Sequence, residues 1–230
     1  MGELKVAWEA VLYGGAMVYP LLLLGALAVG IILDRAIAYS GCLRLPTSVV
    51  TIVDTYGFSW TDLSESLKDL GPRNAYARLL STIASQRHEP AWWVESRASE
   101  EAGEIERILS RGLWVLETAV TAAPLLGLLG TITGMMQAFK VIGGSGLVAP
   151  TEVTGGVAQA LIATALGLLI ALVALFAFNL FSRTVSRAID TMERLASRLV
   201  DRIRLDQENA EKSEGGPALS LEAPKKQRLG

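Results

Sequence analysis

The sequence predicts an all-α membrane protein with three transmembrane helices and long cytoplasmic helical extensions. The composition is the first indication of a membrane protein, because 51% of the 230 residues are hydrophobic, a share at the upper end of the range for soluble domains. The distribution of charge is more decisive. Runs of 20, 22 and 30 residues without a charged side chain cover residues 14–33, 118–139 and 153–182. No segment shows the period-two alternation of a half-buried strand.

Each charge-free run is long enough to cross a bilayer, since a helix of about 20 residues spans a hydrocarbon core about 30 Å thick. A soluble protein would have to bury three helices that are apolar on every side, and the remaining chain is too short to cover them. The lipid bilayer is therefore the first predicted partner. The net charge of −2 gives no basis for a nucleic-acid partner.

The first run has a second interpretation, as a cleaved signal peptide, because Ala36 and Ala38 form a small-x-small pair. The apolar region is too long for that, and the segment before it is not net basic. We therefore expect a retained span. In order, the expected segments are an N-terminus over 1–13, a first span over 14–36, a middle segment over 37–113, a second span over 114–140, a link over 141–153, a third span over 154–182, a helix over 183–207 and a disordered tail over 208–230.

Lys and Arg residues predict the orientation, because cytoplasmic loops carry an excess of them. One cation, Lys5, precedes the first span, and one, Lys140, lies at the link between the second and third spans. Nine lie between the first and second charge-free runs, counting Arg35, and ten follow Ser182. The N-terminus and the link are thus expected on the periplasmic side, and the middle segment and C-terminus in the cytoplasm.

The middle segment is predicted to be helical. Thr61 and Asp62, followed by Glu65, are typical of a capped helix start, and Gly71 with the proline after it indicates a stop. A second helix is expected over 74–85. A third begins after Pro90, and because no breaker precedes the second span, we expect this helix to run into that span without interruption.

Beyond the third span, apolar residues alternate at spacings of four and three, which is a heptad pattern. The pattern covers fewer than three heptads. Two interpretations stay open: the helix packs on its own chain, or it packs on copies of itself. The positions concerned are Val185, Ile189, Met192, Ala196, Leu199 and Ile203.

Small residues mark the second and third spans as packing helices. In the second span they fall at i, i+3, i+4 and i+7, which is one helix face, and they include a GxxxG pair that lets helices approach closely. Pro124 should bend or loosen the turn before it, since it lacks an N–H. The glycines expected to pack are Gly127, Gly130 and Gly134 in the second span and Gly156 and Gly167 in the third.

Three uncharged polar residues in these spans are candidates for an ion path. Thr131 and Thr164 could line a pore, although a membrane threonine often just bonds a carbonyl of its own helix. Gln159 must meet a polar group or water, because an unpaired amide in hydrocarbon is costly. On an ideal helix it points about 140° away from Thr164, so the two need not share one wall.

No catalytic, metal or cofactor site is predicted. Cys42 and His88 are the single cysteine and histidine of the chain, and the sequence holds no nucleotide loop, nucleophile elbow or paired-carboxylate pattern. We expect no enzyme activity.

The stretches APLLGLLGTITG, from residue 123 to 134, and GVAQALIATALG, from 156 to 167, resemble the second- and third-span signatures of the ExbB/TolQ/MotA family. A Leu-rich first span that begins at Tyr19-Pro20 and ends at Asp34-Arg35 also resembles ExbB-type proteins. The resemblance covers residues 14 to about 205. The two glycine-threonine stretches are its specific part.

The resemblance implies a bacterial inner-membrane motor driven by protons, with sodium as the alternative ion. It implies a homopentamer whose second and third spans surround the single-span helices of an ExbD- or TolR-like dimer, and a TonB- or TolA-like protein as a further partner. The partner dimer would supply the ionisable Asp, and Thr131 and Thr164 would be the pore-facing threonines beside it. Gln159 stands where several ExbB and TolQ proteins carry Glu, and an amide cannot titrate.

Two other classes of function compete with the motor. A membrane scaffold or assembly protein that conducts nothing would explain the small-residue faces and the heptad pattern, but not the polar residues in the spans. An independent small-solute transporter fits less well, because three spans without internal repetition rarely provide alternating access.

Overall fold

The computed structural model describes residues 15–54, 58–71, 73–144 and 150–214, and within these ranges the chain forms helices and connecting turns without a strand. Its helices are α2 (Val18–Cys42), α3 (Thr47–Asp54), α4 (Trp60–Lys68), α5 (Ala75–Ser85), α6 (Ala91–Leu109), α7 (Leu113–Gly144) and α8 (Pro150–Glu214). Three helices are long and apolar enough to cross a membrane, within Val18–Cys42, Leu113–Lys140 and Val153–Lys212. The predicted fold class is confirmed.

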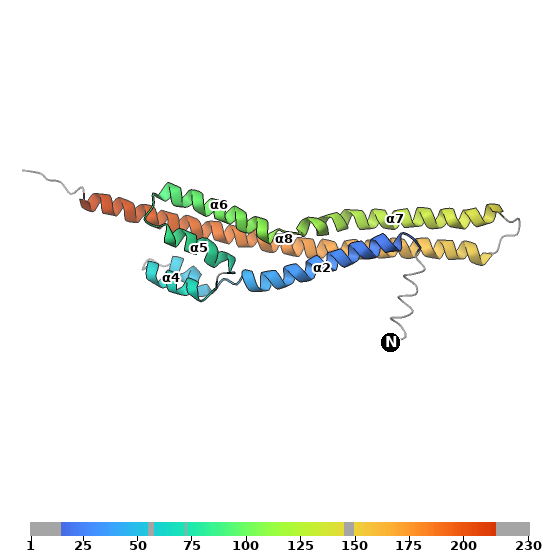
Figure 1. Ribbon diagram of the computed structural model, residues 1–230, viewed down its shortest axis with the longest axis horizontal. Helices are drawn as coiled ribbons and strands as arrows, with labels where there is room; N and C mark the ends of the chain where they lie inside the picture. The colour runs from blue at the N-terminus through green and yellow to red at the C-terminus, as the bar shows by residue number, and fades with distance from the viewer. Residues whose placement is uncertain (1–14, 55–57, 72, 145–149, 215–230) are drawn as a thin grey trace, which may run out of the picture.

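The molecule is elongated around α8, a single helix of 65 residues that extends for about 98 Å. In Figure 1, α7 lies antiparallel along one half of α8, while α6 and α5 lie along the other half. α2 runs beside the α7–α8 pair, and the α7–α8 hairpin extends beyond its N-terminal end. The third span and the C-terminal helix, expected as separate segments, are thus one continuous helix.

The heptad residues of α8 pack on helices of their own chain. Met192, Leu199 and Ile203 are buried in one core together with apolar residues of α5 and α6. α5 contributes Leu79, Leu80 and Ile83 to this core, and α6 contributes Val94, Ala98 and Ile105. Of the two interpretations of the heptad pattern, the structure therefore favours packing within the chain.

Side-chain caps hold the short helices between α2 and α6 in place. The Asn74 carboxamide oxygen accepts bonds from the backbone N–H groups of Tyr76 and Ala77, at 2.9 and 3.1 Å, and its nitrogen donates to the Arg44 carbonyl at 2.6 Å. Asn74 is only 2% exposed, so its three bonds replace the water that it has lost. The helix predicted over 74–85 is confirmed, with Asn74 as its cap.

Two expectations about helix ends were wrong. α4 is capped by Ser59, whose hydroxyl accepts from the Asp62 N–H, and not by Thr61. Ser59 is the cap because it has the extended backbone angles that an N-cap needs, whereas Thr61 is already inside the helix. At the far end, α8 continues to Glu214, so residues 208–214 of the expected tail are helical. Residues 215–230 lie outside the described chain.

The expected continuous helix through residues 110–113 is interrupted. α6 ends at Leu109 and α7 begins at Leu113, with Gly112 at a φ of +81° between them. That left-handed conformation suits glycine and ends a helix. The interruption is also closely packed, since a β-carbon added at Gly112 would lie 3.1 Å from Ile31 of α2. This segment separates α6 from α7, the second helix that is long and apolar enough to cross a membrane.

Other segment bounds differ modestly from the expected ones. α2 begins at Val18 and continues to Cys42, six residues beyond the expected end of the first span. The expected link over 141–153 is shortened from both sides, because α7 reaches Gly144 and α8 begins at Pro150. The helix expected after Pro90 is present as α6.

Candidate ion-path site on the α7–α8 hairpin

Glycine allows the backbones of α7 and α8 to touch. A β-carbon added at Gly134 would lie 2.9 Å from the Gly156 carbonyl oxygen, and one at Gly127 would lie 3.1 Å from the Ala163 carbonyl oxygen. One added at Gly167 would collide with the Ala123 carbonyl oxygen. Such contacts replace the hydrophobic effect, which is weak between helices in lipid.

All five glycines expected to pack lie in this interface. Gly130 faces Ala163, with 2.5 Å from an added β-carbon to the alanine β-carbon, and Gly156 faces Ala138 at 2.8 Å. Pro124 lies within α7, which is helical on both sides of it. A proline leaves the carbonyl four residues before it without its helical bond. The residue before Pro124, Ala123, has its carbonyl oxygen close to Gly167 of α8.

Thr164 joins the two helices by a hydrogen bond. Its hydroxyl donates to the Gly127 carbonyl oxygen over 3.1 Å, from α8 to α7. The Thr131 hydroxyl donates within α7, to the Leu128 carbonyl at 2.6 Å. Because Thr164 lies opposite Gly127, it is one helical turn, about 6 Å along the axis, from the level of Thr131. The structure thus brings the two threonines to neighbouring levels of one hairpin.

Gln159 lies on a different side of the α7–α8 hairpin from Thr131 and Thr164. Its carboxamide rests against the turn at Gly15, where an added β-carbon would collide with it, just before α2 begins. Gly15 has a φ of +74°, so this turn needs glycine for its backbone as well as for the contact. The structure therefore separates Gln159 from the two threonines, and the amide faces the α2 side of the hairpin.

α2 covers that side of the hairpin, except for the end near the α7–α8 link, which extends beyond α2. Met17 contacts Gly130 of α7, with 3.5 Å to an added β-carbon, and Ile170 of α8 contacts Gly25 of α2 at 3.3 Å. Around α8, Thr164 points about 120° away from Ile170, and around α7, Thr131 points about 100° away from Gly130. Both threonines therefore belong to the side of the hairpin that α2 leaves uncovered.

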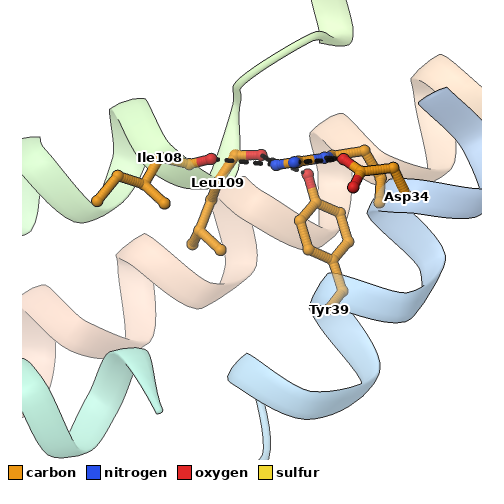
Figure 2. Close-up of polar contacts among 5 residues, drawn as sticks. Asp34, Tyr39, Ile108 and Leu109 are labelled. Carbon is orange, nitrogen blue, oxygen red and sulfur yellow. Dashed lines mark hydrogen bonds and ion pairs between the residues drawn. The ribbon is translucent and has the colours of Figure 1, made fainter. Parts of the chain in front are cut away.

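The sequence did not predict a polar cluster at the interruption between α6 and α7. Figure 2 shows the end of α2 reaching the last carbonyls of α6. The Arg35 guanidinium donates to the Ile108 carbonyl at 3.1 Å and also pairs with Asp34, and the Tyr39 hydroxyl donates to the Leu109 carbonyl at 2.7 Å. Helix-terminal carbonyls lack intrahelical partners, so these donors fill a need that the interruption creates.

The only sequence signal for this cluster is Arg35 at the end of an apolar run, a position that also suits a plain interfacial cation. Tyr39 gives none, although its ring is 8% exposed and packs edge-on against Phe181 of α8 at a centroid distance of 5.4 Å. The cluster ties α2, α6 and α8 together at the interruption between α6 and α7. It is a positioning element for the hairpin.

Three apolar helices, two of them paired through glycine, define a multi-pass helical membrane protein. A family model described as the MotA/TolQ/ExbB proton channel family matches residues 71–194, which is more than half of the chain. The chain belongs to the MotA/TolQ/ExbB family, which is described as a family of proton channels.

Individual relatives agree with the family match. The biopolymer transport protein ExbB-like 1 of Synechocystis sp. is 32% identical over 193 residues, covering 82% of this chain and 75% of that protein. ExbB-like 3 of the same organism is 30% identical over 171 residues, covering 73% and 81%. The biopolymer transport protein ExbB of Xanthomonas campestris is 42% identical over 93 residues, covering 40% of this chain and 37% of its own length.

Proposed function

We propose that this chain is the pore-forming ring subunit of a proton-driven motor in the bacterial inner membrane. Five copies would surround the single-span helices of an ExbD- or TolR-like dimer. Ion flow through the ring would move the dimer relative to it and so perform mechanical work on the cell envelope, through a TonB- or TolA-like protein. Protons are proposed as the ion, with sodium as the alternative.

One observation carries this proposal: α2 covers one side of the α7–α8 hairpin, and Thr131 and Thr164 belong to the other. In a ring, the uncovered sides of five hairpins can face a common axis while the α2 helices face outward to lipid. Large apolar side chains of α2, such as Leu23, Leu27 and Leu33, are exposed in the single chain, as a lipid-facing helix requires.

The side chains of the spans suit the lining of a pore and not a chain of proton-carrying groups within it. Between Val18 and Leu33 of α2, and between Val153 and Ser182 of α8, the chain carries no charged side chain, and α7 carries two, Glu117 near its beginning and Lys140 near its end. A titrating carboxyl at the level of the threonines would have to come from the partner. Threonine hydroxyls suit that role, because they can donate to a carboxylate or accept from its protonated form.

The charge distribution supports a periplasmic N-terminus and a cytoplasmic C-terminus. The helices α3 to α6 and the last part of α8 pack into one body that carries most of the Lys and Arg residues. By the positive-inside rule this body lies in the cytoplasm. The hairpin end between α7 and α8 then faces the periplasm.

A non-conducting scaffold is the second candidate, and one observation favours it. The Thr164 hydroxyl is already used, in its bond to the Gly127 carbonyl between the two helices. A scaffold needs no more than that. However, it leaves Thr131 on the uncovered side without a role.

Native mass spectrometry tests the assembly. The chain is purified in detergent alone and together with its candidate one-span partner. A pentamer that takes up two partner copies supports the ring. A monomer or dimer that ignores the partner contradicts it and moves the scaffold forward.

Proton flux tests conduction. The complex is placed in vesicles that contain a pH-sensitive dye, and flux is driven by a potassium diffusion potential. We expect Thr131→Val to abolish most of the flux with the pentamer intact, because valine keeps the shape and removes the hydroxyl. Thr133→Val is the matched control, since Thr133 bonds a carbonyl of its own helix in the same way and points about 160° away from Thr131. Wild-type flux in both variants would mean that Thr131 is not part of the ion path, and an absence of flux in the wild-type complex would support the scaffold.

A further inference from the structure

Glu117 is the one ionisable side chain of α7 between Leu113 and Phe139. It lies in the second turn of the helix and is exposed in the chain. A carboxylate at a membrane boundary must face water, head groups or a cation, because burial in hydrocarbon is costly. Its surroundings therefore indicate what it is used for.

The position of Glu117 around α7 places it on the uncovered side of the hairpin. Gly130, which contacts Met17 of α2, points about 140° away from it. Thr131 points only about 40° away, and so does Thr121, which is exposed. Glu117 thus shares a side of α7 with the candidate pore threonine and lies about 21 Å from it along the axis, toward the cytoplasmic body.

The cations near this end of the hairpin do not neutralise Glu117. On α2, Arg35 pairs with Asp34 and donates to α6 carbonyls. Arg111 precedes α7, and Arg183 and Arg187 follow the apolar part of α8. Among the ion pairs of the described residues, none involves Glu117. The carboxylate is left open to solvent at the cytoplasmic end of the helix.

We propose that Glu117 exchanges protons between the pore and the cytoplasm. The inference rests on the proposed function, because it needs the uncovered sides of the hairpins to face a common pore. Five copies would then form a ring of carboxylates at the cytoplasmic mouth. A carboxylate takes a proton from a hydronium ion in the pore and releases it to bulk water, so that only O–H bonds form and break. The negative ring also raises the local concentration of cations.

A structural role for the same carboxylate has to be separated from this one. An acidic side chain in the first turns of a helix interacts favourably with the N-terminal end of the helix dipole. Glu117→Gln would weaken that interaction too. The experiment therefore needs a readout that depends on proton transfer by the carboxylate and not on the stability of the helix.

The test uses the intact complex in vesicles and compares three variants. We expect Glu117→Gln to reduce proton flux on the order of tenfold or more, since a positioned proton-transfer group is lost. Glu117→Asp should keep most of the flux. Glu193→Gln is the control, because Glu193 is an exposed carboxylate of α8 within the cytoplasmic body. It should conduct like the wild type.

Chemical rescue supplies the independent readout. Formate or azide, added on the cytoplasmic side, can carry protons in place of a missing carboxylate but cannot restore a helix dipole interaction. Recovery of flux in Glu117→Gln, with little change in the wild type, supports the proposal. Wild-type flux in Glu117→Gln overturns it, and so does a loss that neither acid rescues.

The outcomes also distinguish the inference from the proposed function. If Thr131→Val stops the flux and Glu117→Gln does not, the proposed pore is supported and the proposed role of Glu117 is wrong. If the wild-type complex conducts no protons, both fail.

Discussion

The Tyr39 hydroxyl of α2 donates a hydrogen bond to the carbonyl of Leu109, the last residue of α6, over 2.7 Å. The two residues are 70 positions apart in sequence, and their bond lies where α6 ends and α7 begins. Arg35, one turn earlier on α2, donates to the adjacent Ile108 carbonyl at 3.1 Å (Figure 2). The first span therefore holds the connection between α6 and the α7–α8 hairpin.

The Tyr39–Leu109 bond predicts a stability effect. Tyr39→Phe keeps the ring against Phe181 and leaves the Leu109 carbonyl without this donor. We expect a loss of about 1 kcal/mol in the free energy of unfolding, the usual worth of such a bond. Thermal unfolding in detergent measures it. Tyr19→Phe is the control, since Tyr19 is 67% exposed. Equal midpoints for both variants would contradict a holding role.

The glycine interface predicts a position-dependent response to alanine. Gly167→Ala would push a β-carbon into the Ala123 carbonyl oxygen, so the helices must separate. We expect a destabilisation of about 1–3 kcal/mol, as for other overpacked sites. At Gly30 of α2 an added β-carbon meets nothing within 4 Å, so Gly30→Ala should be neutral or stabilising. Both are read from thermal unfolding in detergent. A tolerated Gly167→Ala would mean that α7 and α8 are not packed this closely.

The sequence was sufficient for the fold class and the spans because bilayer thickness sets the length of a charge-free run. It was not sufficient for the interruption at Gly112. Glycine is tolerated inside helices, so its presence at 112 does not predict a left-handed turn, and the close packing of that turn against Ile31 of a distant helix appears only in the structure. Nor could Tyr39 be recognised, since its partner is a backbone carbonyl that only the tertiary structure brings near.

Of the candidate site, too, the sequence predicted one part and not another. Helical geometry alone predicted that Gln159 and Thr164 point in different directions. Which of the two faces α2 is decided by packing between helices, through the contacts of Gly15 with Gln159 and of Gly25 with Ile170. The roles of these residues in an ion path stay predictions.

The two threonines should differ in their effect on stability. Thr164→Val removes a bond between helices, to the Gly127 carbonyl, and we expect it to cost about 1 kcal/mol. Thr131→Val removes only a bond within α7, to Leu128, and should cost less. Thr164→Ser keeps the hydroxyl and should retain most of the stability. Thermal unfolding of the detergent-purified protein ranks the three variants. A ranking with Thr131→Val as the least stable would contradict this account.

The burial of Tyr76 predicts how the body formed by α3 to α6 and the last part of α8 responds to alkali. Its phenol lies in the buried core of α5, and burial raises its pKa above the usual value of 10.0, more than the nearby Arg194 lowers it. The unfolded chain therefore releases this proton at a lower pH than the folded chain does. By linkage, the contribution is fully present below about pH 10 and is lost as pH rises through the folded pKa.

We expect the free energy of unfolding to fall above about pH 10 in the wild type and to fall less steeply in Tyr76→Phe, which has no proton to lose. The difference between the two curves isolates the phenol from other groups that titrate at high pH. Urea unfolding of the detergent-solubilised protein at pH 8 to 11 measures it. Tyr19→Phe serves again as the control, since Tyr19 is exposed and should leave the slope unchanged. Parallel curves for the wild type and Tyr76→Phe would mean that the phenol reaches water in the folded protein.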